Sequence, residues 1–260
     1  MAEQKIPKKI HFIWYGDKLP KFAQENLRRC EALYPDYEIK IWGEEDFDPE
    51  TRRYTREALK AGKWAFVSDY LRVKILYEEG GIYLDTDMVA VKSIEPYLGD
   101  NKVVMGFEYR KMVTTGFTAC EPKHPLFRKV LEVYEAFDHL EENEKFKFMV
   151  NNELWTYYMV ELYGLILNNK TQQLPDGIKI MPYGWFSDYN IGAETYFLHD
   201  HQLSWTAKWK AKIMNYMLPK VRKYWMPIEP ILVAVAAQMK VKNRNRIKAV
   251  MNAKAKKENK

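Results

Sequence analysis

The most regular hydrophobic pattern in the chain covers Trp64–Glu79 and predicts an amphipathic helix. Val67, Leu71 and Ile75 recur at every fourth position, which places them on one buried face. Two glycines follow at positions 80 and 81, and glycine accepts the left-handed conformation in which helices commonly end. The helix is therefore expected to stop just before the next apolar segment.

Alternating patterns predict strands on both sides of this helix. The segment Ile82–Val91 is β-branched and alternating, so Asp85 and Asp87 should point to the same side of a strand, or of the turn that it enters. A strand, helix, strand order near the start indicates a βαβ unit and an α/β class. Further strands are expected at Lys9–Trp14, Tyr37–Trp42, Val103–Phe107 and Gly177–Trp185, and further helices at Ala23–Leu33, His124–Phe137 and Leu154–Leu167.

Composition narrows the class of protein. The chain has 260 residues, of which 47% are hydrophobic and 15% aromatic, and this content excludes a largely disordered chain. Its start has no apolar stretch of the signal-peptide type, so a cytoplasmic location is expected. Cys30 and Cys120 are the only cysteines, too few for a disulfide framework or a thiolate zinc site.

Charge divides the chain into two parts, a catalytic domain at residues 1–207 and a basic amphipathic extension at 208–260. Residues 208–223 carry six basic side chains and no acid, whereas the preceding 207 residues are net acidic. Lysines interleaved with aromatic residues suit an anionic membrane surface, and a solvated helix with a disordered basic end is the alternative. A basic tail also fits nucleic-acid binding, but the acidic body argues against it.

The candidate chemistry centres on Asp85 and Asp87. A carboxylate pair at this spacing can hold a hard divalent cation, and its position after an apolar run and two glycines is unlike that of a solvated charged face. On the preceding helix, Asp69 and Arg72 are three residues apart and share a face. They form either a simple intrahelical ion pair or a site for sugar and phosphate oxygens.

Three separated motifs resemble glycosyltransferase family 32, the enzymes with the DXD sugar-binding region. The run SDYLRVKILYEEGGIYLDTDM at Ser68–Met88 is similar to the family's signature. The opening IPKKIHFIWYG resembles its first strand, and YFLHDHQLSW at Tyr196–Trp205 resembles its late His-containing Ser-Trp motif. The family includes yeast initiating mannosyltransferases and bacterial capsule or lipopolysaccharide sugar transferases, and the catalytic core of large clostridial glucosylating toxins is similar.

The resemblance implies a fold and a set of site residues. The fold would be of the GT-A type, a nucleotide-binding mixed sheet flanked by helices, here followed by a basic helical C-terminal extension. Asp87 and His199 would bind Mn²⁺ or Mg²⁺, with His201 as a competing ligand, and Asp85, Asp87 and Arg72 would be catalytic. The residues expected to bind the nucleotide sugar are Trp14 at the base, Ser68, Asp69, Arg72 and Asp85 at the sugar, and Ser204 and Trp205 at the diphosphate.

The implied activity is a retaining hexosyl transfer from a nucleotide diphosphate sugar to a polysaccharide or lipid-linked oligosaccharide, as in capsule, exopolysaccharide or lipopolysaccharide synthesis. A UDP-sugar is favoured, although fungal relatives use GDP-mannose, and the enzyme would work at the inner face of the cell membrane. Thr115 stands where the family has a small amide, and NNELWTYY lacks its Thr-Gly-Pro, so the acceptor side departs from the pattern. The alternatives are an effector-like protein glucosyltransferase and a non-catalytic membrane- or nucleic-acid-binding scaffold.

Overall fold

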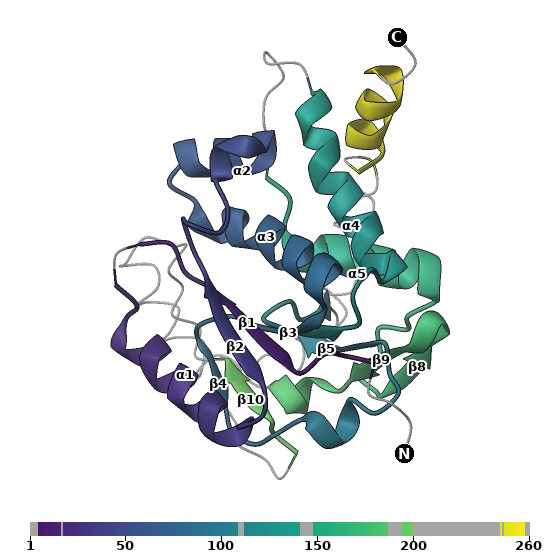
Figure 1. Cartoon of the computed structure of the whole chain (residues 1–260). Coiled ribbons are helices and arrows are strands. Elements are labelled where there is room, and N and C mark those ends of the chain that lie inside the picture. The colour runs from purple at the N-terminus through teal and green to yellow at the C-terminus, as the bar shows by residue number, and fades with distance from the viewer. Residues whose placement is uncertain are drawn as a thin grey trace, which may run out of the picture.

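A mixed β-sheet forms the centre of the computed structural model, which describes residues 5–16, 18–108, 112–140, 148–186, 194–199, 245 and 247–257 (Figure 1). Its strands follow the order β2-β1-β3-β7-β5-β9-β8, and β6 pairs with the end of β5. A separate two-stranded sheet joins β10 to β4. The strands are β1 (Lys9–Ile13), β2 (Glu38–Trp42), β3 (Gly81–Leu84), β4 (Met88–Ala90), β5 (Val103–Glu108), β6 (Met112–Val113), β7 (Phe117–Cys120), β8 (Gln172–Leu174), β9 (Ile178–Met181) and β10 (Phe197–His199).

Strand direction gathers the carboxyl ends of five strands at one edge of the main sheet. β1 is parallel to β2 and to β3, and β9 is parallel to β5. β7 runs antiparallel to both β3 and β5, so β3 and β5 share a direction. In open α/β sheets, ligands bind outside the carboxyl ends of the strands. The residues that follow β1, β3 and β5 are therefore candidates for a ligand-binding site.

Helices cover one face of this sheet, and α1 with the small sheet covers the other (Figure 1). Side chains alternate between two apolar clusters: on β3, Tyr83 joins the cluster under α3 and α4, whereas Ile82 and Leu84 join the cluster around α1 and β10. The helices labelled in Figure 1 are α1 (Lys21–Leu33), α2 (Arg53–Lys60), α3 (Trp64–Glu79), α4 (Pro125–Ala136) and α5 (Asn151–Tyr163).

The predicted α/β class, with a mixed sheet flanked by helices, is confirmed. One expectation was wrong in part: Ile82–Val91 is not one strand, because the chain turns after Leu84 and continues as β4 in the other sheet. The strand expected at Gly177–Trp185 is also shorter, since β9 ends at Met181 and a 3₁₀ turn follows. The sequence patterns missed α2 and β7.

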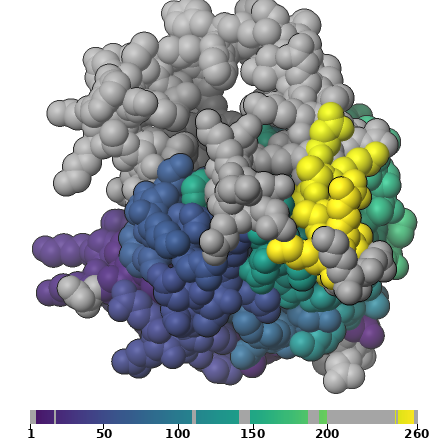
Figure 2. All heavy atoms as spheres, turned by 90° about the horizontal axis from the view of Figure 1, so that it is seen from above, coloured from purple at the N-terminus to yellow at the C-terminus, as the bar shows by residue number. Residues whose placement is uncertain are grey.

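Residues 247–257 form a helix at the C-terminal end of the described chain. Ile247 and Val250 are buried in the same cluster as α4 and α5, and the yellow helix lies beside the teal segment in both views (Figures 1 and 2). The rest of the predicted extension, apart from residue 245, lies outside the described residues. Within the part of the chain that the structure describes, none of the helices has the length and apolar character needed to cross a membrane.

Candidate active site

The segment from Asp85 to Asp87 is a turn held by hydrogen bonds on both sides. The Asp85 N–H donates to the Gly116 carbonyl at 2.8 Å, and the Met88 N–H closes the turn onto the Asp85 carbonyl at 2.9 Å. From α1, the buried Asn26 donates its side-chain N–H to the Thr86 carbonyl at 2.8 Å. Three elements therefore fix the backbone from which the two carboxylates project.

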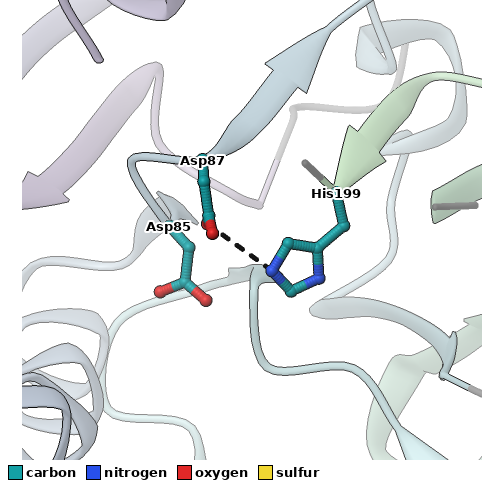
Figure 3. Close-up of side chains that lie close together, drawn as sticks. All are labelled: Asp85, Asp87 and His199. Carbon is teal, nitrogen blue, oxygen red and sulfur yellow. Dashed lines mark ion pairs between the residues drawn. The ribbon is translucent and has the colours of Figure 1, made fainter. Parts of the chain in front are cut away.

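Asp85, Asp87 and His199 come together as a candidate metal site (Figure 3). One ligand atom from each lies within 4.8 Å of the other two, and His199 Nε2 is 3.5 Å from Asp87 Oδ1. His199 is brought there by β10, which pairs antiparallel with β4 and places His199 opposite Met88. Two carboxylate oxygens and one imidazole suit Mn²⁺ or Mg²⁺ and leave positions for phosphate oxygens. The residues fit the predicted cation.

The histidine of this group is held in its charged form by its acidic neighbours. Burial alone would lower the pKa of His199, but the hydrogen bond to Asp87 and the charges of Asp87, Asp85 and Glu108 raise that pKa to about 9. A protonated imidazole stands in for part of the positive charge that a metal ion would supply. The acidic groups around His199 therefore create a negative potential that favours a bound cation.

Arg72 connects α3 to the same turn. Its Nη1 lies 3.0 Å from Asp85 Oδ1 and donates to the Thr115 carbonyl at 2.9 Å, and its Nη2 lies 3.1 Å from Asp69 Oδ1. The side chain is only 7% exposed, so these partners offset the cost of burying its charge. Burial acts to lower the pKa of the guanidinium, but Asp85, Tyr83 and Asp69 raise it above the usual range. Arg72 is a fixed positive charge between two carboxylates.

The environment of Asp69 disfavours the charged form of its carboxylate. Burial raises the pKa of Asp69 to about 6, against the opposing effects of Arg72 and of a hydrogen bond from Asn151. Asn151 Nδ2 donates to Asp69 Oδ1 at 3.1 Å, and Asn151 Oδ1 accepts from the Tyr134 hydroxyl at 3.0 Å. Titratable groups with perturbed pKa values cluster at functional sites. The helix pair α4 and α5 thus orients a residue on α3.

The other predicted residues divide into three groups. Trp14 follows β1 at the same sheet edge, and its buried indole N–H has no hydrogen-bond partner among the described residues. Ser68 contacts the site indirectly, because its hydroxyl donates to the Ala65 carbonyl at 2.9 Å and accepts from Arg72 Nη2 at 3.3 Å. The predicted Ser204 and Trp205, and the competing His201, lie outside the described residues.

Sequence reasoning missed Tyr83, Asn151 and Asn26. Tyr83 donates its hydroxyl to Asp85 Oδ1 at 2.7 Å, and its position two residues before Asp85 on one strand face was a usable signal. Asn26 and Asn151 are brought in from α1 and α5, far along the chain from the aspartates. No local pattern marks residues of that kind, because their contacts depend on the packing of helices against the sheet.

Comparison with protein families identifies this region. Residues 20–104, which hold the turn, Arg72 and Asp69, match the family described as "Glycosyltransferase sugar-binding region containing DXD motif". The chain carries a glycosyltransferase family domain. This confirms the resemblance predicted from Ser68–Met88, which lies within the matched range together with Asp85 and Asp87.

Two curated relatives and one solved structure show how far the likeness extends. The chain is 27% identical to mannosyl phosphorylinositol ceramide synthase of Saccharomyces cerevisiae and 24% identical to inositol phosphoceramide mannosyltransferase 1 of Schizosaccharomyces pombe, each over 52% of this chain. The matches span 36% and 45% of those relatives' own lengths. The solved PaToxG glycosyltransferase is 20% identical, with a TM-score of 0.47 over 60% of this chain and 69% of that one.

Proposed function

We propose that this protein is a metal-dependent, retaining glycosyltransferase that moves a hexose from a nucleotide diphosphate sugar to a hydroxyl of a glycan or lipid-linked acceptor. The single observation that carries the proposal is the meeting of Asp85, Asp87 and His199 within 4.8 Å of one another at the carboxyl edge of the sheet. The buried pair of Arg72 and Asp69 adjoins this group through Asp85. A divalent cation at this group could hold the phosphates of a nucleotide-sugar donor, and the adjoining pair could bind its sugar.

The proposed donor site extends along the sheet edge from the base to the sugar. Trp14 would contact the base, since an aromatic ring offers a stacking surface and its unpaired N–H a donor. Arg72 and Asp69 would bind sugar hydroxyls, and Asn151 keeps Asp69 oriented toward Arg72. A UDP-sugar is the proposed donor, and GDP-mannose is the competing one because the two relatives named above are mannosyl-transferring proteins by name.

The residues around the turn would stabilise the negative charge that develops on the leaving phosphate. Breaking the bond from the sugar to the diphosphate places negative charge on the departing phosphate, and a bound Mn²⁺ or Mg²⁺ stabilises such charge as a Lewis acid. Asp85, Asp87 and His199 would hold that cation. Arg72 keeps Asp85 in place through the 3.0 Å contact with its Oδ1. A front-face transfer without a covalent sugar intermediate is our hypothesis for the retained stereochemistry.

Membrane association belongs to the same proposal. The two relatives carry ceramide in their names, and a lipid-linked acceptor would bring this chain to an anionic membrane surface through residues 208–260. In the described part of that extension, Ile247 and Val250 are buried whereas Lys248 and Lys256 are exposed. The helix therefore presents basic groups outward while its apolar side packs on the domain. This arrangement supports our proposal that the enzyme works at the inner face of the cell membrane.

Nucleotide release from a donor panel tests the activity. The purified protein with Mn²⁺ is incubated with UDP-glucose, UDP-galactose, UDP-N-acetylglucosamine and GDP-mannose, and free nucleotide is measured over time. One donor should be turned over, and Arg72→Lys should slow that turnover by about 100-fold because a lysine cannot contact Asp69, Asp85 and Thr115 together.

Arg28→Lys is the matched control, since Arg28 lies on the exposed side of α1 and pairs only with Glu25 among the contacts described. Its turnover should equal that of the wild type. Equal turnover by Arg72→Lys would remove Arg72 from the donor site. Failure to release nucleotide from any donor, with or without Mn²⁺, would contradict the proposed activity.

A further inference from the structure

A third carboxylate, Glu108, lies at the same edge of the sheet as the candidate metal site. It is the last residue of β5, which runs in the same direction as β3, so Glu108 and Asp85 both stand at carboxyl ends. Only β7 separates those two strands, and its start is preceded by Thr115 and Gly116. The order along the edge is therefore Asp85, the Thr115 turn and Glu108.

Side chains alternate between the two faces of the sheet along β5, and this alternation places Glu108 on the face where β10 and His199 lie. Val103, Met105 and Phe107 belong to the cluster under the helices, whereas Val104 belongs to the cluster that includes β10. Gly106, on the same side as Val104, lies against Phe186 of that second cluster. Glu108 continues this row, and its charge is one of those that act on His199.

A chain of hydrogen bonds fixes Glu108 relative to Arg72. Asn152, in the first turn of α5, donates its Nδ2–H to Glu108 Oε2, and its Oδ1 accepts from the Thr115 hydroxyl at 2.7 Å. The Thr115 carbonyl in turn accepts from Arg72 Nη1 at 2.9 Å. The half-buried Glu108 is thus linked to Arg72 through Asn152 and Thr115. A solvated surface glutamate would have no need of such support.

We propose that Glu108 is the carboxylate that receives the attacking hydroxyl and accepts its proton. This inference rests on the proposed function. The acceptor oxygen bonds to the anomeric carbon, the bond from that carbon to the β-phosphate oxygen breaks, and its electron pair leaves with the nucleoside diphosphate. The hydroxyl proton passes to the Glu108 carboxylate and then to solvent. A negative charge here selects an uncharged alcohol as the acceptor, such as a sugar or cyclitol hydroxyl, over an anionic group.

Water can take the place of the alcohol, so the test needs no identified acceptor. Nucleotide release by hydrolysis is measured for the wild type and Glu108→Gln with Mn²⁺ and the fastest donor of the panel, and nucleotide affinity is measured by calorimetry. We expect turnover to fall about 100- to 10,000-fold, the usual contribution of a general base. Nucleotide affinity should stay within about threefold, because glutamine keeps an oxygen for Asn152.

Two further variants separate a chemical role from a structural one. Glu121→Gln changes a half-buried, ion-paired glutamate that follows β7 at the opposite edge, and its turnover should be unchanged. Glu108→Ala should regain turnover at least about tenfold when sodium formate is added, since a small carboxylate can occupy the vacated space. Unchanged turnover in Glu108→Gln, with a wild type that does release nucleotide, would overturn the inference alone. Wild-type protein that binds no nucleotide would overturn the proposed function and this inference with it.

Discussion

At the scale of single residues, the site is a balance of charges that surround one turn. Arg72 is shared by Asp69 and Asp85, while Asp87 faces His199. The sequence predicted Asp69, Arg72, Asp85, Asp87 and His199, because a motif and a resemblance mark them. It did not predict Glu108 or Asn152, whose roles depend on strand order and on how α5 packs. The presence of the site could thus be predicted from sequence, but its supporting residues could not.

Metal binding should depend on pH through His199. Because the pKa of His199 is raised to about 9, a metal must displace a proton from this imidazole at neutral pH. Below about pH 9 the apparent Mn²⁺ affinity should therefore fall as pH falls, by about tenfold per pH unit. Calorimetry between about pH 6 and about pH 7.5, in buffers of different ionisation enthalpy, counts the released protons.

About one proton should be released per Mn²⁺ bound by the wild type at neutral pH. The His199→Asn variant is the control, because it keeps a ligand atom of similar reach but has no proton to lose. Its residual binding should release no such proton. Metal binding that is equally strong across the range, without proton release, would show that His199 is not a ligand.

At the scale of elements, the corner between α3 and β3 determines where the turn begins. Gly80 and Gly81 both have positive φ, and the sequence predicted this break from the glycines themselves. The buried His11 accepts from the Trp42 indole at 3.1 Å and reaches the Gly80 carbonyl at 2.9 Å. This contact joins β1 and β2 to the corner. The sequence did not predict that Ile82–Val91 would divide between two sheets, because alternation alone does not reveal a change of partner strand.

Gly81→Ala should destabilise the fold more than the same substitution at a positive-φ glycine with open space around it. A Cβ on Gly81, where φ is +93°, would lie 2.7 Å from the Lys9 carbonyl oxygen and 3.1 Å from His11 Nε2. Gly62 has φ of +64° and nothing within 4 Å of a built Cβ. Urea unfolding should show a loss of about 3 kcal/mol for Gly81→Ala and about 1 kcal/mol for Gly62→Ala. Equal losses would mean that crowding at the corner is relieved by movement.

At the scale of the whole molecule, the direction of the strands and the position of the second sheet explain why the candidate site residues lie at one edge of the main sheet. β1, β3 and β5 share a direction, so Trp14, Asp85 and Glu108 follow them at one edge, and β10 adds His199 from the second sheet. The order of the expected strands and helices predicted an α/β class, and the distribution of charge predicted an acidic body with a basic end. The strand order could not be predicted, because β7 is inserted between β3 and β5 from later in the chain.

The basic helix at residues 247–257 should contribute to membrane binding without being required for the fold. Full-length protein is mixed with vesicles containing about one-third phosphatidylserine and separated by flotation at low salt. The double variant Lys248→Glu and Lys256→Glu should float less, since each exposed lysine near an anionic surface contributes on the order of 1 kcal/mol. The double variant Lys248→Gln and Lys256→Gln should be intermediate. Equal flotation of all three proteins would remove this helix from the proposed membrane contact.

The most direct test of the donor site is calorimetric titration of the protein with UDP and with GDP, each with and without Mn²⁺, for the wild type, Asp87→Asn and the exposed control Asp100→Asn. Asp87 lies in the group that could hold the cation, and Asp100 does not. Our account predicts that UDP binds the wild type and Asp100→Asn only with Mn²⁺, and that Asp87→Asn loses most of this affinity. Nucleotide binding that is equal with and without Mn²⁺, or unchanged in Asp87→Asn, would contradict it.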